Sequence, residues 1–324
     1  MYPWLTHYWQ LWLEEFNQGR LAHAWLISGA SGMGKGALAE QMAAHVLCQH
    51  PGPSGPCGLC HGCQLMIHGN HPDLLRLGHQ GERSIGIDAV RELIARVSGS
   101  AQLSGYKVVL LARAEIMTEA AANALLKTLE EPPGRTLFVL QSAESARLLP
   151  TILSRCQKLL LAMPPASAVL GWLQQQPGGA NATEQQLRLN QYAPLRTLEY
   201  LASGLDEKRR KLLESVAAVQ SQPAMVAKLA EQILASQPDS LKWLGSLLLD
   251  ALKAQCGCPA TEWAMADAPH VVRQLATRST AALLEANQAL QALLVPEAMP
   301  SSMPSLQFIQ WCHHYLVEEN SLAR

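Results

Sequence analysis

A glycine-rich segment with one lysine is the first feature of this sequence that could bind a charged ligand. Residues 29–36 read GASGMGKG and follow a short apolar run, AWLIS, at 24–28. Glycines let backbone N–H groups turn inward around phosphate oxygens, and a lysine at the start of the next helix can reach the terminal phosphates. The spacing therefore predicts a nucleotide phosphate loop. Its candidate binding residues are Gly29, Gly32, Gly34 and Lys35.

The residues that normally complete such a loop are replaced here. The position after the lysine should offer a Ser or Thr hydroxyl to Mg²⁺, and it is Gly36. The apolar run KVVLL at 107–111 should be followed by acidic residues that hold the metal and orient water, but Ala112 and Arg113 follow it. Glu115 is the nearest carboxylate, and we expect it to be a solvated residue at a helix start. These losses predict a relic of an ATPase site that binds nucleotide, at most, without turnover.

A cluster of cysteines follows the phosphate loop. Cys57, Cys60 and Cys63 are spaced at intervals of three, with glycines that permit tight turns. Cys48 precedes them and is the predicted fourth ligand, because it completes an all-sulfur set that selects Zn²⁺. The alternative fourth ligands are His50, His61 and His68. Four protein ligands leave no position for water, so the predicted zinc is structural.

The elements that must position these residues are indicated by the apolar pattern. Short runs that are apolar on nearly every residue predict strands covered on both faces, at 24–28, 73–77, 107–111, 137–140 and 158–161. Helices are predicted between them, at 34–48, 87–97 and 119–131. Thr118 can cap the last of these helices and Pro132 must end it. The expected fold class is α/β, a doubly wound parallel sheet with helices on both faces.

The strand signal stops after residue 163, and the remainder is predicted to be all-α. Breaks rich in Gly and Pro divide it into a small helical unit at 164–205 and a larger helical domain from 206 to 324. Within the larger domain, one helix shows an apolar stripe that we interpret as ordinary core. The stripe consists of Leu241, Leu244, Leu248 and Leu252.

Composition excludes several classes of protein. The net charge of −1 gives no global excess that would drive binding to nucleic acid or acidic lipid, so any DNA contact must be local. No run of 18 apolar residues and no basic leader is present, so we expect a cytoplasmic protein. Only 16% of the residues are charged and 48% are hydrophobic, which indicates that other subunits cover part of the surface. The cysteines outside the cluster are interpreted as free thiols: Cys156, Cys256, Cys258 and Cys312.

Two further segments complete a recognisable order of motifs. Residues 120–133 read AAANALLKTLEEPP, and residues 151–156 read TILSRC. With the phosphate loop and the cysteine cluster, they resemble the clamp-loader branch of the AAA+ ATPases over residues 20–163. The resemblance implies that Arg155 reaches into the ATP site of a neighbouring subunit as an arginine finger. The domains it implies are a RecA-like AAA+ domain at 1–163, a helical lid at 164–205 and a C-terminal helical collar for oligomerisation at 206–324.

The resemblance also implies a role in DNA replication. Motor subunits of this family keep a Mg²⁺-binding hydroxyl and an Asp-Glu pair, which Gly36, Ala112 and Arg113 replace here. This difference from the motor subunits favours a catalytically silent subunit. Such a subunit joins gamma/tau and delta subunits in a heteropentamer that loads the sliding clamp onto primed DNA for DNA polymerase III, a nucleotidyltransferase complex. Its contact with the clamp is expected to be weak or indirect. The alternatives are an active gamma/tau-like ATPase and a zinc-bearing nucleotide sensor outside replication.

Overall fold

The computed structural model describes residues 1–78, 81–103, 105–293 and 304–317. Within these residues, five parallel strands form one sheet in the order β2-β3-β4-β1-β5. The strands are β1 Ala24–Ser28, β2 Leu74–Leu77, β3 Lys107–Leu111, β4 Thr136–Ser142 and β5 Gln157–Leu160. Every expected strand is present: β1 and β3 have the expected ends, and the ends of β2, β4 and β5 differ from the expected ones by at most two residues. The prediction of a doubly wound parallel sheet is confirmed.

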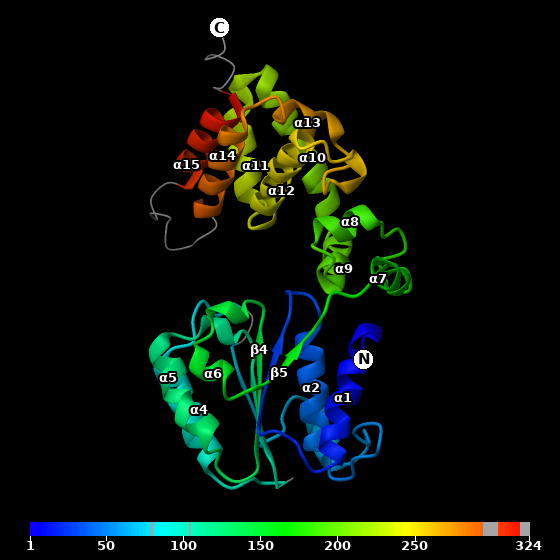
Figure 1. Ribbon diagram of the computed structural model, residues 1–324, viewed down its shortest axis with the longest axis vertical. Coiled ribbons are helices and arrows are strands. Elements are labelled where there is room, and N and C mark those ends of the chain that lie inside the picture. Colours follow the sequence, from blue (N-terminus) through cyan, green and yellow to red (C-terminus); the bar gives the residue numbers. More distant parts are fainter. Residues whose placement is uncertain (79–80, 104, 294–303, 318–324) are drawn as a thin grey trace. The chain divides into compact units, whose positions relative to one another are not determined.

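Helices cover both faces of this sheet (Figure 1). Side chains alternate between the faces of a strand, so Trp25 and Ile27 of β1 pack in one cluster and Ala24 and Leu26 in the other. The first cluster includes α1 and α2, and the second includes α4, α5 and α6. The helices of this part of the chain are α1 Thr6–Asn17, α2 Lys35–Val46, α3 His61–Ile67, α4 Ile87–Ser98, α5 Glu119–Glu130 and α6 Pro150–Leu153. Three of these helices, α1, α3 and α6, were not predicted from the sequence.

The helix α5 begins and ends as its sequence predicts. The Thr118 hydroxyl accepts a hydrogen bond from the backbone N–H of Ala121 at 3.2 Å, which satisfies one of the unpaired donors of the first turn. The last helical residue is Glu130, and Pro132 follows the C-cap Glu131. Two carboxylates therefore stand at the C-terminal end of this helix.

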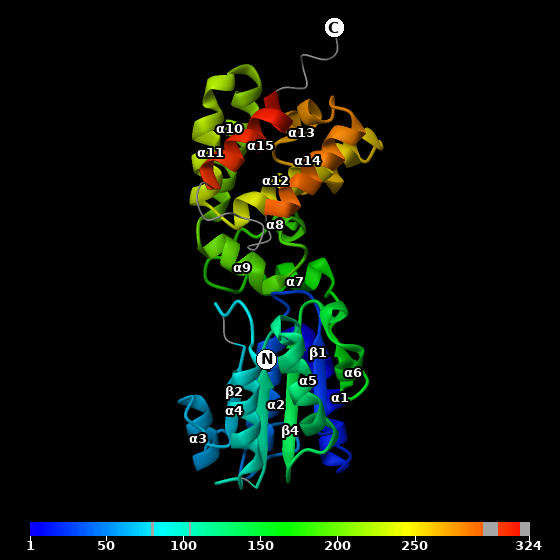
Figure 2. The ribbon, with the colours of Figure 1, turned by 90° about the vertical axis from the view of Figure 1, so that its left-hand side faces the viewer.

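The chain divides into two compact units, Met1–Ala168 and Val169–Arg324. The second unit contains only helices among its described residues (Figure 2). The helix α7 spans the division, and the helices from α7 onward are α7 Ala166–Leu173, α8 Glu184–Leu189, α9 Pro194–Ala202, α10 Leu205–Ser221, α11 Val226–Ala235, α12 Asp239–Gln255, α13 Pro269–Leu275, α14 Thr280–Leu293 and α15 Pro304–Cys312. Leu241, Leu244 and Leu248 of the α12 stripe are buried in the core, and Leu252 packs against it. The finer division into lid and collar stays a prediction, since Tyr200 of α9 lies in the same core cluster as α10–α15.

A buried arginine links several helices of this second unit. Arg209 of α10 is 2% exposed. Its guanidinium donates to the Tyr200 hydroxyl at 2.9 Å, to Asp206 at 3.2 Å and to both carboxylate oxygens of Asp267. Burial alone would raise the pKa of Asp267, but the bonds and charge of Arg209 outweigh it and hold that pKa below its ordinary value. The network therefore fixes α10 against α9 and the segment before α13.

Candidate functional site

The predicted phosphate loop lies at the carboxyl end of β1, which is flanked by β4 and β5. In open parallel sheets, ligands bind at this edge, where neighbouring connections diverge. The loop ends at Gly34, whose φ of +88° is left-handed, and α2 begins at Lys35. The Lys35 ammonium folds back and donates to the carbonyls of Gly29 at 2.7 Å and Ala30 at 2.9 Å. The loop thus closes on Lys35 at the N-terminus of α2, and Gly32 and Gly34 within it both have positive φ.

Aromatic residues from the start of the chain lie against this loop. A Cβ on Gly34 would lie 2.8 Å from the Tyr2 ring, so the close approach requires glycine there as much as the backbone angle does. Trp4 stacks on Tyr2 and donates its indole N–H to the Met33 carbonyl at 2.9 Å. This packing was not predicted from the sequence, although the density of aromatic residues in MYPWLTHYW was a signal for it.

The positions that should hold Mg²⁺ carry no ligand. Gly36 has no side chain, and Ala112 follows β3 where an acidic residue was required. Arg113 adopts a left-handed backbone (φ 56°) and donates its guanidinium to the Glu82 carbonyl at 2.9 Å. Among the described residues, the cysteine cluster is the one group of three or more His, Cys, Asp or Glu side chains that could hold a metal ion, and it does not include the residues of the phosphate loop.

Glu115 lies near the phosphate loop and is partly buried. It lies in a short 3₁₀ helix, Ala114–Ile116, and its side chain is half-buried: one oxygen accepts from the Ala143 N–H at 3.4 Å, and the other is buried without a hydrogen-bond partner. The left-handed turn at Arg113 reverses the chain and brings the carboxylate back to the sheet edge. Burial lowers the pKa of Lys35, and the charge of Glu115 opposes part of that shift. Glu115 therefore lies at a helix start, as expected, but one of its carboxylate oxygens is buried.

The four cysteine sulfurs form a compact cluster. All four lie within 4.8 Å of one another, and the set contains none of the three alternative histidines. Two of the separations, Cys48 to Cys60 and Cys57 to Cys63, are 3.8 and 3.9 Å. A tetrahedral zinc ion with bonds of about 2.3 Å places its sulfurs about 3.8 Å apart, so these positions fit that metal. Cys48 follows the end of α2 and Cys63 lies in α3, which ties the cluster to two helices.

Backbone donors around the cluster favour the thiolate form. The N–H groups of Cys57, Cys60 and Cys63 point to the sulfurs of Cys48, Cys57 and Cys60 at 3.3–3.4 Å. Burial would raise the pKa of Cys60, but backbone N–H groups and neighbouring thiols lower it to about 6. Burial raises the pKa of Cys63 to about 12. A metal ion that binds here must displace the remaining protons, so acid opposes binding.

Replacing Cys60 by Ser should remove the metal. The serine oxygen is a poor substitute for a thiolate, and metal binding is coupled to local folding, so bound zinc should fall well below one ion per chain and residues 48–70 should lose hydrogen-exchange protection. Metal content is measured by atomic absorption on purified protein. The matched control is Cys256→Ser, an exposed thiol outside the cluster. Full zinc content in the Cys60 variant would exclude Cys60 as a ligand.

The arginine of TILSRC lies on the surface of the first unit. Arg155 follows α6 and precedes β5, and its side chain is 30% exposed. It forms an ion pair with Glu130 at the end of α5. The pairing was not anticipated, although both residues belong to the motifs that the sequence analysis had singled out.

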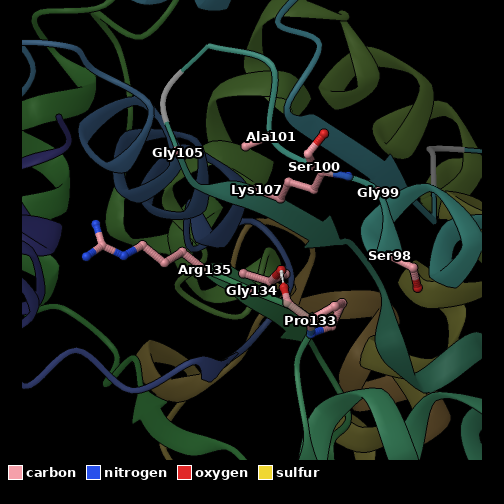
Figure 3. Close-up of a pocket in the computed structure, with 10 residues that line it drawn as sticks. Ser98, Gly99, Ser100, Ala101, Gly105, Lys107, Pro133, Gly134 and Arg135 are labelled. Atoms are coloured by element: carbon pink, nitrogen blue, oxygen red, sulfur yellow. Dashed lines mark hydrogen bonds between the residues drawn. The ribbon is translucent and has the colours of Figure 1, made fainter.

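A separate hollow of about 380 Å³ lies at the opposite edge of the sheet, beside the amino ends of β3 and β4. In Figure 3 its two cations, Lys107 and Arg135, point in opposite directions. Lys107 donates to the carbonyls of Arg96 and Val97 at the end of α4, and Arg135 lies over the Tyr106 ring at 5.5 Å. Both cations therefore make contacts within the chain that stabilise the fold, and we assign no ligand to this hollow.

Comparison with known proteins places this geometry in a family. Residues 4–165 match the family model described as DNA polymerase III, delta subunit, and residues 203–295 match the model described as its C-terminal part. DNA polymerase III subunit delta' of Pseudomonas aeruginosa is 39% identical, with 89% of this chain and 88% of the relative covered. Subunit delta' of Escherichia coli is 38% identical, with 88% and 85% covered. DNA polymerase III subunit tau of Bacillus subtilis is 28% identical over 71% of this chain and 39% of the relative. No helix among the described residues is both long and apolar enough to span a bilayer.

Proposed function

Because the chain belongs to the family of DNA polymerase III delta' subunits, we propose that it is a catalytically silent clamp-loader subunit that assists hydrolysis on a neighbouring chain. In this role it associates with gamma/tau and delta subunits in a heteropentamer that loads the sliding clamp onto primed DNA. The names of its relatives support DNA replication as the process. The division of labour within the complex is our inference from the site.

The observation that carries the proposal is a phosphate loop without hydrolytic groups. The glycine spacing and Lys35 support phosphate binding, while Gly36, Ala112 and Arg113 offer neither a metal ligand nor a proton acceptor. Phosphoryl transfer depends on a positioned metal ion and a group that orients the attacking water. A chain that lacks both can hold its fold, or a nucleotide, without turnover.

In the proposed function, Arg155 acts on the ATP that is bound to a neighbouring subunit. A guanidinium is charged at any physiological pH and presents paired N–H donors that match phosphate oxygens. Placed against the ATP of a neighbouring motor subunit, it would neutralise the charge that develops on the transferring phosphoryl group. Its position on an exposed turn, outside its own phosphate loop, supports action on another chain.

The cysteine cluster has a structural role in this proposal. Cys48, Cys57, Cys60 and Cys63 would hold Zn²⁺ with no open coordination position, so the ion takes no part in phosphoryl transfer. It would fix the segment between α2 and α3, which contains little regular structure of its own. This accounts for a tight metal site in a chain without metal chemistry.

A motor function of the gamma/tau type is the second candidate, and Glu115 is the observation that favours it. Its buried oxygen without a partner lies at the sheet edge that carries the phosphate loop, and its charge acts on Lys35. In a motor, this carboxylate would orient the attacking water. The two candidates make opposite predictions for the isolated chain.

The silent-subunit and motor functions are distinguished by measuring the release of phosphate from ATP by the purified chain. The silent subunit should show no turnover with saturating ATP and Mg²⁺, and Lys35→Ala and Glu115→Gln should not change that result, because no group is available to orient water. A motor subunit added to the same assay is the positive control. Turnover that is lost in both variants would establish the motor function and overturn the proposal. Assembly is checked separately, by co-purification with gamma/tau and delta and by the mass of the complex.

A further inference from the structure

The guanidinium of Arg155 is already engaged within its own chain. Nε donates to Oε1 of Glu130 at 2.7 Å, and Nη2 donates to the same oxygen. Nη1 donates to the Thr151 carbonyl at 2.8 Å and makes a longer contact of 3.4 Å with the Ser154 hydroxyl. Four of the five N–H donors of the side chain therefore have a partner in this arrangement.

This engagement works against the chemistry proposed for Arg155. A carboxylate in direct contact cancels much of the positive charge that a phosphoryl group would meet, and it occupies the Nε–Nη2 edge that binds two oxygens at once. An arginine that keeps this pairing offers a phosphate one unengaged donor and little net charge. Action on a neighbouring ATP requires the pair to open.

The position of Glu130 gives no advantage to its own helix. The C-terminal end of a helix carries partial negative charge, so a carboxylate there is unfavourable. Glu130 and Glu131 both stand at this end of α5. Among the described residues, Arg155 is the cation that the structure pairs with Glu130.

We propose that Glu130 is a latch that holds Arg155 in a docked, charge-compensated state in the free subunit and releases it when a neighbouring ATP site takes the guanidinium. The inference rests on the proposed function of Arg155. The side chains of Arg155 and Glu130 are 30% and 46% exposed, so water and salt screen the pair and it opens at low cost. Glu130 itself touches no reacting atom; it sets how readily the finger is available.

The pair is tested first in the free full-length chain. In the wild type, the Nε–H of Arg155 should give a distinct NMR signal with slow solvent exchange, assigned by its loss in Arg155→Lys. Glu130→Gln should accelerate that exchange, because an amide oxygen is a weaker acceptor than a carboxylate. Glu131→Gln is the matched control, since it removes a neighbouring charge from the same helix end. Equal exchange in the wild type and both Gln variants would overturn the latch.

The release is tested in the complex reconstituted with gamma/tau and delta. Glu130→Gln should raise ATP turnover by about two- to fivefold, the range expected when one exposed ion pair no longer competes, while Glu131→Gln leaves it unchanged. In an Arg155→Ala background, Glu130→Gln should have no effect, because the two residues act through one contact. An altered fold would not produce this dependence on Arg155.

The outcomes distinguish failure of the arginine finger at Arg155 from failure of the Glu130 latch. If Arg155→Ala leaves turnover unchanged, the proposed function fails, whatever the NMR experiment shows. If Arg155→Ala lowers turnover but Glu130→Gln behaves like Glu131→Gln, the latch alone fails. A fall in turnover with Glu130→Gln would also overturn the latch, because it would make Glu130 a residue that positions the finger.

Discussion

Replacing Arg155 by Ala should slow ATP hydrolysis at the neighbouring site by about a thousandfold or more, the effect typical of an arginine finger. The complex as a whole should lose the share of turnover that this one site contributes. The physical reason is that charge accumulates on the transferring phosphoryl group, and no other group of this chain is expected to replace a bidentate cation there. Arg155→Lys should recover little, because an ammonium is a point charge without the planar fork. Turnover is measured by phosphate release in a complex saturated with the variant.

The control for this experiment is another exposed arginine of the same region. Arg147→Ala removes a cation that pairs with Glu144 at 3.5 Å, three residues earlier in the chain, and it should leave turnover unchanged. The mass of the complex must be the same with every variant, so that a lost subunit is not mistaken for a lost finger. Unchanged turnover with Arg155→Ala in an intact, saturated complex would refute the finger.

Replacing Asp267 by Asn should destabilise the second unit by about 3 kcal/mol, since removing one partner of a buried ion pair leaves the other charge without compensation. Arg209 is 3% exposed in its side chain and would keep only Asp206 as an anionic partner. We place the estimate at about the lower end of the usual range because the Asp267 side chain is 30% exposed. Urea unfolding, followed by hydrogen exchange of the α10 and α13 amides, measures the change in this unit alone.

The same pair gives a dependence on pH. The pKa of Asp267 is lowered in the folded chain, so the stabilisation is present above the unfolded pKa of about 4 and is lost as pH falls through the lower, folded value. The wild type should therefore approach the Asp267→Asn variant in strongly acidic solution. The control variant is Glu207→Gln, which breaks exposed pairs with Arg210 and Lys211 and should change stability by less than about 1 kcal/mol. Equal effects of the two variants at neutral pH would contradict the role assigned to the buried network.

Features that depend on neighbouring residues were predictable from the sequence. The strands were found because each is apolar on nearly every residue, and α5 because Thr118 and Pro132 bound it. The cysteine cluster was predicted for the same reason: three of its ligands lie within one short segment, so their spacing already limits where their sulfurs can meet. The replacement of the expected metal-binding residues was also visible, because Gly36, Ala112 and Arg113 follow landmarks that the sequence identifies.

Residue type and local spacing were enough to predict the sheet, the cysteine cluster and the lack of metal-binding side chains at Gly36 and Ala112. Which distant side chains meet depends on the folded arrangement of the chain. Glu130 and Arg155 are separated by 25 residues, and Arg209 and Asp267 by 58. Glu115 returns to the sheet edge through a left-handed turn at Arg113, a conformation that residue type does not predict for arginine. Such pairings depend on how whole elements pack, and local periodicity carries no information about that packing.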